Sequence, residues 1–330
     1  MTKILIIQTA YIGDSILSTV LIKPLREKFE HSEIHILTTN ALAPIFELTP
    51  VDKIHIIDKR HSSLTAQLRL AKKLRLEKFD IVLLPHRSMR SAILAFLSGA
   101  KIRIGFALQL KCIFFTHCVK YDMTKHEAQR FLELLEPLGI DTEVTDFPFL
   151  PDRQNDDAMR KTLPKNYIVI APGSVWFTKR WPIAYFSELA GYFINDRQHV
   201  VLIGAASETE LCEEIVKNND SQWIYNLCGK TDLQQFFIAV KHARFVVTND
   251  SSPVHVASAV GTPAAVILGS TVSEFGFGPL AQGSIAISNE TLSCRPCSIH
   301  GLNACPKKHF KCMLELTPKK VYSIIKENFV

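Results

Sequence analysis

Short apolar runs alternate with amphipathic segments along nearly the whole chain, and this alternation limits the possible folds more than any other feature. In the first half the apolar runs predict five strands, at residues 4–8, 34–37, 54–57, 81–84 and 102–105. Helical periodicity predicts helices between them, at residues 16–28, 64–76 and 91–97. Strands that are apolar on both faces and alternate with helices indicate a parallel sheet covered on both sides.

The same alternation restarts in the second half, after a polar segment. Residues 148–166 are rich in Pro, Asp and Lys and are predicted to connect two domains, 1–150 and 151–330. Five further strands are predicted, at 167–171, 200–204, 224–226, 245–248 and 264–268. Helices are predicted at 211–216, 233–240, 254–260 and about 318–328, the last a candidate to pack back on the first domain. The pattern predicts two Rossmann-like α/β domains, with ligands at the carboxyl ends of the strands.

Composition narrows the class of protein. The chain is 47% hydrophobic and 21% charged, which excludes a disordered or fibrous protein. No apolar run approaches the roughly 20 residues that span a bilayer, and the run at residues 4–7 is too short for a signal-peptide core. We therefore expect a cytoplasmic protein, with its eight cysteines as thiols or metal ligands rather than disulfides. The net charge of +6 permits an anionic partner but shows no nucleic-acid stripe.

Two familiar motifs are missing from the sequence. There is no G-x-G-x-x-G, which disfavours a dinucleotide-dependent dehydrogenase. There is also no Asp-x-Asp, which disfavours a metal-bridged diphosphate. We therefore expect neither a metal nor a cofactor, and a diphosphate leaving group would be neutralised by protein groups.

Gly13 and Asp14 follow the first predicted strand and begin a helix. Aspartate is a favoured N-cap residue and is stabilised at the positive end of the helix dipole, so Asp14 is a candidate cap. The same position lies at the mouth of the predicted sheet, where a carboxylate can act as a catalytic base. The residues alone leave both interpretations open.

A second polar segment follows the first strand of the second half. Ser174 belongs to a Pro-Gly-Ser turn, and Lys179 and Arg180 come shortly after it. Two adjacent cations beside such a turn suit a phosphate group. The alternative is a solvated loop in which Trp181 and Pro182 form a packing wedge.

The segment 249–255 lies between a predicted strand and a predicted helix. Ser251 and Ser252 suit the start of the helix, where backbone N–H groups bind anions. His255, in the first turn, is either a further donor to such an anion or a structural histidine. Glu208, after the strand at 200–204, is a candidate to accept hydrogen bonds from ribose hydroxyls, although a glutamate in a first helical turn is also unremarkable.

Half of the cysteines fall in the tail, at positions 294, 297, 305 and 312, with His300 and His309 among them. Cysteine pairs and histidines are the usual zinc ligands. The spacing between Cys305 and Cys312 is wider than in most structural zinc sites. A thiol-lined packing cluster is therefore the preferred interpretation, with a zinc site as the alternative.

Taken together, these segments resemble the ADP-heptose:lipopolysaccharide heptosyltransferases, glycosyltransferase family 9, and most of all the heptosyltransferase II branch. The resemblance covers nearly the whole chain. It implies the GT-B architecture, in which two Rossmann-like domains face a central cleft. The first domain would bind the acceptor and the second the nucleotide-sugar donor. The residues that match the family's acceptor side are Gly13, Asp14, Arg87, Arg90, His126 and Arg130. Those that match its donor side are Ser174, Lys179, Arg180, Glu208, Asp250, Ser251, Ser252 and His255.

The resemblance also implies a reaction. Asp14 would take a proton from an acceptor hydroxyl while that oxygen attacks the anomeric carbon of ADP-L-glycero-D-manno-heptose. Lys179, His255 and N–H groups near Ser251 would stabilise the departing ADP, and Asp250 would orient His255 or bind a heptose hydroxyl. The implied acceptor is the lipid A-linked inner core of lipopolysaccharide, at the cytoplasmic face of the inner membrane. The alternatives are a transferase or epimerase for another nucleotide sugar, and a non-catalytic nucleotide-sugar-binding module.

Overall fold

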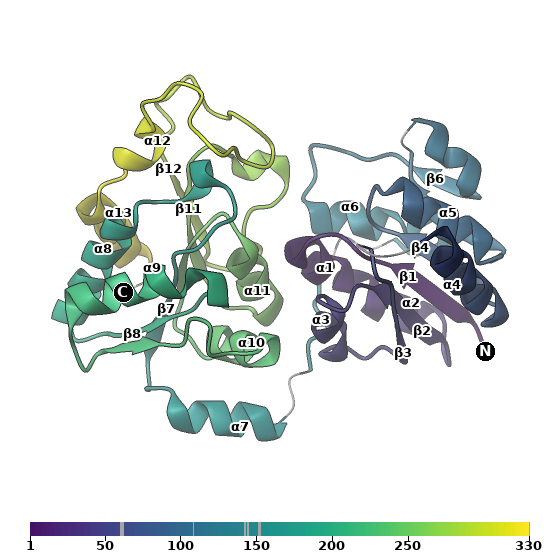
Figure 1. The fold of residues 1–330 in the computed structure, drawn as a ribbon, viewed down its shortest axis with the longest axis horizontal. Helices are drawn as coiled ribbons and strands as arrows, with labels where there is room; N and C mark the ends of the chain where they lie inside the picture. Colours follow the sequence, from purple (N-terminus) through teal and green to yellow (C-terminus); the bar gives the residue numbers. More distant parts are fainter. Residues whose placement is uncertain (60–62, 108, 142, 144, 151–152, 330) are drawn as a thin grey trace. The chain divides into compact units, whose positions relative to one another are not determined.

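The protein folds into two compact units, residues Met1–Leu150 and Pro151–Val330, each of which has its own parallel sheet (Figure 1). This computed structural model describes the chain except for residues 60–62, 108, 142, 144, 151–152 and 330. Among the described residues, no helix combines the length and the apolar composition needed to cross a membrane.

The first unit is a six-stranded parallel sheet in the order β3-β2-β1-β4-β5-β6. Its strands are β1 (Lys3–Ile7), β2 (Glu33–Thr38), β3 (Lys53–Ile56), β4 (Ile81–Leu84), β5 (Ile102–Phe106) and β6 (His117–Val119). Its helices are α1 (Ile12–Ser18), α2 (Ile22–Lys28), α3 (Ala43–Glu47), α4 (Leu64–Leu76), α5 (Met89–Leu97) and α6 (Glu127–Glu133), with 3-10 turns η1 (Thr19–Leu21), η2 (Gln109–Phe114) and η3 (Glu136–Leu138). The chain runs outward from β1 to β3 and returns to place β4 on the other side of β1. The strand order therefore reverses between β1 and β4, where α/β sheets bind ligands.

The second unit repeats this plan with the strand order β12-β11-β10-β7-β8-β9. Its strands are β7 (Tyr167–Ala171), β8 (His199–Leu202), β9 (Ile224–Asn226), β10 (Val246–Asn249), β11 (Ala264–Leu268) and β12 (Ile285–Ser288). Its helices are α7 (Arg153–Thr162), α8 (Ile183–Asn195), α9 (Thr209–Asn219), α10 (Leu233–Lys241), α11 (Ser252–Val260), α12 (Lys311–Leu314) and α13 (Pro318–Phe329), with 3-10 turns η4 (Phe177–Lys179), η5 (Ala206–Glu208) and η6 (Ser273–Phe275). Here the order reverses between β7 and β10.

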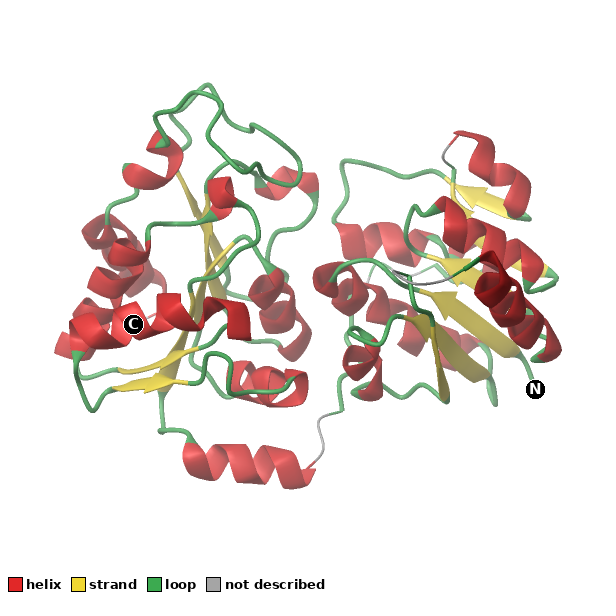
Figure 2. Cartoon of the chain, in the orientation of Figure 1, coloured by secondary structure: helices red, strands yellow, loops and turns green. Residues whose placement is uncertain are grey.

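The central strands are buried because helices cover both faces of each sheet (Figure 2). Ile4 to Ile7 of β1 and all five residues of β7 are buried. In β1, Ile4 pairs with Ile34 on one side and with Ile81 on the other. An unbroken apolar run of this kind is stable only at the centre of a covered parallel sheet. The ten predicted strands are all present, and their ends differ from the predicted ones by at most two residues.

The structure differs from the sequence-based expectations at the edges of the sheets and in the connection. The edge strands β6 and β12 were not predicted, because they are short and only partly buried. The predicted helix 16–28 is divided into α1, η1 and α2. Pro24 is the third residue of α2, and in a continuous α-helix its ring would clash with the carbonyl of Val20, four residues earlier in η1. The segment 148–166 is not only a connection, because it contains α7, which packs on α10. Residues 151–152 of that segment lie outside the described residues.

The last helix, α13, packs with its apolar face on the core of the second unit. Val321 and Ile325 of α13 are fully buried in the core of that unit, and α13 packs on α8. The expectation that this helix also packs back on the first domain stays a prediction.

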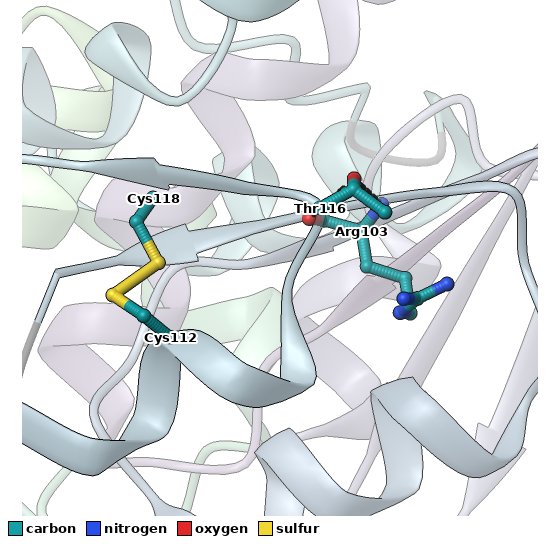
Figure 3. The surroundings of a disulfide bond; sticks show 4 residues. All are labelled: Arg103, Cys112, Thr116 and Cys118. Atoms are coloured by element: carbon teal, nitrogen blue, oxygen red, sulfur yellow. Dashed lines mark hydrogen bonds between the residues drawn. A yellow bond between two sulfur atoms is a disulfide. The ribbon is translucent and has the colours of Figure 1, made fainter.

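One pair of cysteines forms a disulfide, which corrects the expectation that all cysteines are thiols or metal ligands. Cys112 of η2 and Cys118 of β6 are bonded, with their Cα atoms 5.9 Å apart (Figure 3). The chain turns between these elements, and the turn brings the two residues within bridging range. The other six cysteines are free.

Candidate functional site

Asp14 lies at the β1–β4 switch point of the first unit. Helix α1 begins at Ile12, and its N-cap is Tyr11, so Asp14 is the third helical residue. The interpretation of Asp14 as an N-cap is therefore wrong. Gly13, which was predicted on the acceptor side, is the second residue of the helix and is partly exposed. The carboxylate of Asp14 instead accepts a hydrogen bond from the backbone N–H of the N-cap residue, Tyr11.

The surroundings of Asp14 raise its pKa to about 6. Burial is the largest cause, because it disfavours the charged carboxylate, and the negative charge of Glu127 is the second. A backbone N–H of Tyr11 and the charge of Arg87 act in the opposite direction. A carboxyl that is partly exposed and has a pKa near the operating pH suits proton transfer.

Glu127 is held in place by a buried network. Arg130 donates from Nη1 to Glu127 Oε2 at 2.6 Å and to Tyr121 Oη at 2.9 Å, and the Tyr121 hydroxyl also donates to Glu127. Arg130 is fully buried and also donates to the carbonyls of Asp122 and Met123. This network positions the negative charge that acts on Asp14.

The residues predicted on the acceptor side differ in exposure and in their partners. Arg87 is exposed, its guanidinium carbon lies 4.6 Å from the centre of the Tyr121 ring, and its charge acts to lower the pKa of Asp14. Arg130 is buried and acts as a positioning residue. His126 is the N-cap of α6, where its Nδ1 accepts from Ala128 N at 3.1 Å. Arg90 is exposed and donates to the carbonyl of Lys59 at 3.0 Å.

In the second unit, Asn249 joins the two loops of the β7–β10 switch point. Its side chain is fully buried, donates to Pro172 O at 2.7 Å and accepts from Trp181 N at 3.0 Å. The segment after β7 is thereby fixed to the end of β10. From the sequence alone, Asn249 is identified only as part of the segment 249–255. Its position as the last residue of a buried strand is the feature from which its role in joining the two loops could have been predicted.

Lys179 and Asp250 form a salt bridge across the same edge. The distance between Nζ and Oδ2 is 2.7 Å, and both side chains are only 13% and 11% exposed. Asp250 also accepts from Thr271 Oγ1 at 2.6 Å. Asp250 therefore orients Lys179, and a role of Asp250 toward His255 or a heptose hydroxyl stays a prediction. A cation held in this way lies at the carboxyl ends of β7 and β10, where the architecture binds ligands.

The start of α11 follows β10 at this edge. Ser251 is its N-cap, and instead of capping the helix its hydroxyl donates to Gly173 O at 3.2 Å. Ser252 is the first helical residue, and His255 is buried in the first turn, with its ring 6.3 Å from that of Phe277. The first turn of a helix presents backbone N–H groups that favour an anion.

Glu208 lies against the loop after β7. A Cβ atom on Gly173 would lie 1.8 Å from Glu208 Oε1, so only glycine leaves room for this carboxylate. Glu208 also accepts from Ala205 N at 2.8 Å. Glu208 and Ser251 thus both lie beside Gly173.

Ser174 and Arg180 have structural partners. Arg180 donates from Nε to Ser174 O at 2.7 Å and from Nη2 to Val175 O at 3.0 Å. Ser174 is buried. Arg180 therefore stabilises the turn that precedes Lys179. The two adjacent cations thus differ: Arg180 bonds backbone carbonyls, whereas Lys179 pairs with Asp250.

The cysteine-rich tail supports the same edge from behind. Arg295 donates to Gly269 O and, at 2.9 Å, to the carbonyl of Thr271, the same threonine whose hydroxyl donates to Asp250. The hydroxyl of Thr178 shares a hydrogen bond of 2.8 Å with the hydroxyl of Ser270, and it also accepts from Leu302 N. Cys294 Sγ lies 3.8 Å from His309 Nε2. Among the described residues, no three His, Cys, Asp or Glu side chains are grouped so as to hold a metal ion.

Comparison with known proteins identifies the family. Residues 67–305 match the model of glycosyltransferase family 9 (heptosyltransferase), which is more than half of the chain. The chain belongs to glycosyltransferase family 9. It is a glycosyltransferase of the GT-B fold, as the sequence predicted.

Curated relatives agree with this membership. The chain is 26% identical to lipopolysaccharide heptosyltransferase 2 of Salmonella typhimurium over 83% of this chain and 84% of the relative. It is 27% identical to lipooligosaccharide heptosyltransferase 2 of Campylobacter jejuni over 97% and 96%. These matches confirm the predicted resemblance to the heptosyltransferase II branch.

Solved structures confirm the fold. A family 9 glycosyltransferase from Veillonella parvula superposes with a TM-score of 0.87 at 23% identity, covering 99% of this chain and 97% of that one. The ADP-heptose lipopolysaccharide heptosyltransferase II of E. coli gives a TM-score of 0.82 at 21% identity, covering 99% and 98%.

Replacing Asp14 by Asn tests its chemistry. Asn retains the shape and most hydrogen bonds of Asp but cannot accept a proton from a hydroxyl, so we expect the single-turnover rate of glycosyl transfer to fall by roughly 10²-fold or more. The melting temperature should hold or rise, because the variant removes a charge that is buried near Glu127.

The matched control is Asp232→Asn. Asp232 is a true N-cap, whose side chain accepts from Gln235 N at 2.7 Å, and Asn caps as well as Asp. This variant should transfer at the wild-type rate. If Asp14→Asn also kept the wild-type rate, Asp14 would not be the base.

Proposed function

We propose that this glycosyltransferase moves L-glycero-D-manno-heptose from ADP-heptose to the inner core of lipopolysaccharide, with inversion at the anomeric carbon. The observation that carries the proposal is the cation of Lys179, held by Asp250 at the switch point of the second unit beside the start of α11. The names of the relatives in the heptosyltransferase 2 group support the choice of sugar and acceptor. We expect the protein to work at the cytoplasmic face of the inner membrane, as a peripheral protein.

The donor would bind at the β7–β10 edge. Lys179, the backbone N–H groups at Ser251 and Ser252, and the imidazole of His255 would contact the diphosphate. Glu208 would accept hydrogen bonds from the ribose hydroxyls, since its carboxylate lies beside Gly173 on the same edge. Asp250 would hold the ammonium group of Lys179 in position rather than touch the phosphate.

The acceptor would bind in the first unit, at the β1–β4 edge. Asp14 would take the proton of the acceptor hydroxyl, and that oxygen would form the new bond to the anomeric carbon. The bond from this carbon to the β-phosphate oxygen would break, and ADP would leave with the electron pair. Fixed donors aimed at the developing charge are usually the largest contribution to catalysis of this kind. Arg87, close to Asp14, would contact an anionic group of the acceptor.

The direct test incubates the protein with ADP-heptose and a lipid A-linked core that lacks the next heptose, and reads the product by mass. We expect one heptose to be added, and we expect the reaction to continue in EDTA because protein groups neutralise the diphosphate. Transfer or epimerisation with UDP-sugars, and no reaction with ADP-heptose, would show the alternative enzyme. Binding of ADP-heptose without turnover would show a binding module.

Removing the amine of Lys179 tests the donor site. In Lys179→Ala the diphosphate loses a charged hydrogen-bond donor and faces the unpaired carboxylate of Asp250. We expect ADP binding to weaken by about 1.5–3 kcal/mol in calorimetry. Lys241→Ala is the control, because Lys241 also pairs with an aspartate, Asp156, at 3.3 Å. Equal ADP affinity in the two variants would contradict the proposed phosphate site.

A further inference from the structure

The positive charge of the chain is concentrated in one stretch of the first unit. Residues 59–121 contain thirteen Lys or Arg and only two Asp or Glu, so this stretch carries a formal charge of +11. The rest of the chain therefore has a net negative charge, although the whole chain has +6. The stretch includes α4, α5 and η2, which form one side of the first unit (Figure 1). From residue 81 to residue 121 there is no acidic residue at all.

The outer face of α5 is apolar in the middle of this basic stretch. Ser91, Ala92, Leu94 and Ala95 form its buried face. On its outer face, Met89, Ile93 and Phe96 are 42%, 39% and 47% exposed. These positions have the spacing of one helical stripe, where an ordinary surface helix carries polar residues. Arg90 is the exposed charged residue on the same face.

The turn η2, which lies against α5, exposes a further apolar side chain. Ile113 is 71% exposed, and η2 packs on α5. The disulfide between Cys112 and Cys118 ties the residue before Ile113 to β6 (Figure 3). We call Met89, Ile93, Phe96 and Ile113 the apolar patch.

Arg103 and Phe114 support the apolar patch from below. The Phe114 ring meets the Phe96 ring edge-on at 5.9 Å. Arg103 donates from Nε to Phe114 O at 2.9 Å, and its guanidinium carbon lies 5.5 Å from the centre of the Phe96 ring. Thr116 accepts from Arg103 N at 2.8 Å (Figure 3). The ring of Phe96 is therefore packed against Phe114 and Arg103 although it is exposed.

We propose that the apolar patch, with the cations around it, binds the surface of an anionic lipid bilayer. Apolar side chains enter the boundary between headgroups and acyl chains, and nearby cations are attracted to anionic headgroups. Exposed cations lie on both helices: Arg69 and Lys72 on α4, which packs on α5, and Arg90 on α5 itself. A second copy of the chain fits this surface poorly, because two faces with the same charge repel each other. The inference rests on the proposed function, in which the acceptor is a lipid in the membrane.

The test measures binding of the full-length protein to phosphatidylglycerol vesicles by co-sedimentation, with phosphatidylcholine vesicles beside them. We expect binding to phosphatidylglycerol and at least about tenfold weaker binding when Ile93 and Phe96 are both replaced by Gln. The matched control replaces Ile299 and Leu314 by Gln, because these apolar residues of the second unit are each 43% exposed. The control should bind as the wild type does. Equal binding by the two double variants, or equal wild-type binding to both lipids, would overturn the proposal.

Two further measurements keep this result separate from the proposed function and from misfolding. Transfer to a water-soluble core oligosaccharide should be the same in the Ile93/Phe96 variant as in the wild type, since these residues lie outside the proposed catalytic site. If the wild type itself transferred no heptose to this oligosaccharide, the proposed function would be refuted, while the vesicle-binding result would still stand. In Ile93→Trp, phosphatidylglycerol vesicles should shift the fluorescence of the new indole to the blue, and an unchanged spectrum would contradict insertion of the patch.

Discussion

Both candidate sites depend on one constraint of a parallel sheet, the point at which the strand order reverses. At such a point the loops after two adjacent strands turn away in opposite directions and leave their backbone and side chains at the same edge. In the first unit this edge holds Asp14 after β1 and Arg87 after β4. In the second it holds Lys179 after β7 and Asp250 after β10, joined by their salt bridge. The strand order therefore determines where each candidate site lies, and its side chains determine which reaction it can support.

The charged groups around Asp14 and those around Lys179 are arranged differently. Around Asp14 a buried network holds Glu127 so that its charge raises the pKa of the carboxyl. Around Lys179 the partners are arranged to fix a cation: Asp250 accepts from it, and Thr271 and Arg295 hold that loop in turn. A raised carboxyl pKa favours proton transfer, and a fixed cation favours an anionic leaving group. This division agrees with an acceptor side and a donor side.

The sequence predicted the central strands and the motif residues because both follow from local pattern. Apolar runs identify β1 and β7, and polar residues directly after such runs identify Asp14 and Asp250. The sequence could not distinguish Arg87 from Arg130, because only the fold shows that Arg130 is buried in a network of its own. Partners distant in sequence, such as Thr271 for Asp250, and short edge strands such as β6 also leave no periodic signal.

The central claim is that a carboxyl with a raised pKa, Asp14, is the base of the transfer reaction. The most direct measurement is the pH dependence of the single-turnover rate with saturating donor and acceptor. Because the base must be unprotonated, the rate should rise with pH, reach half its maximum at about pH 6 and level off above that value. A rate that stays constant down to pH 5, as an aspartate with an ordinary pKa would give, would contradict the account.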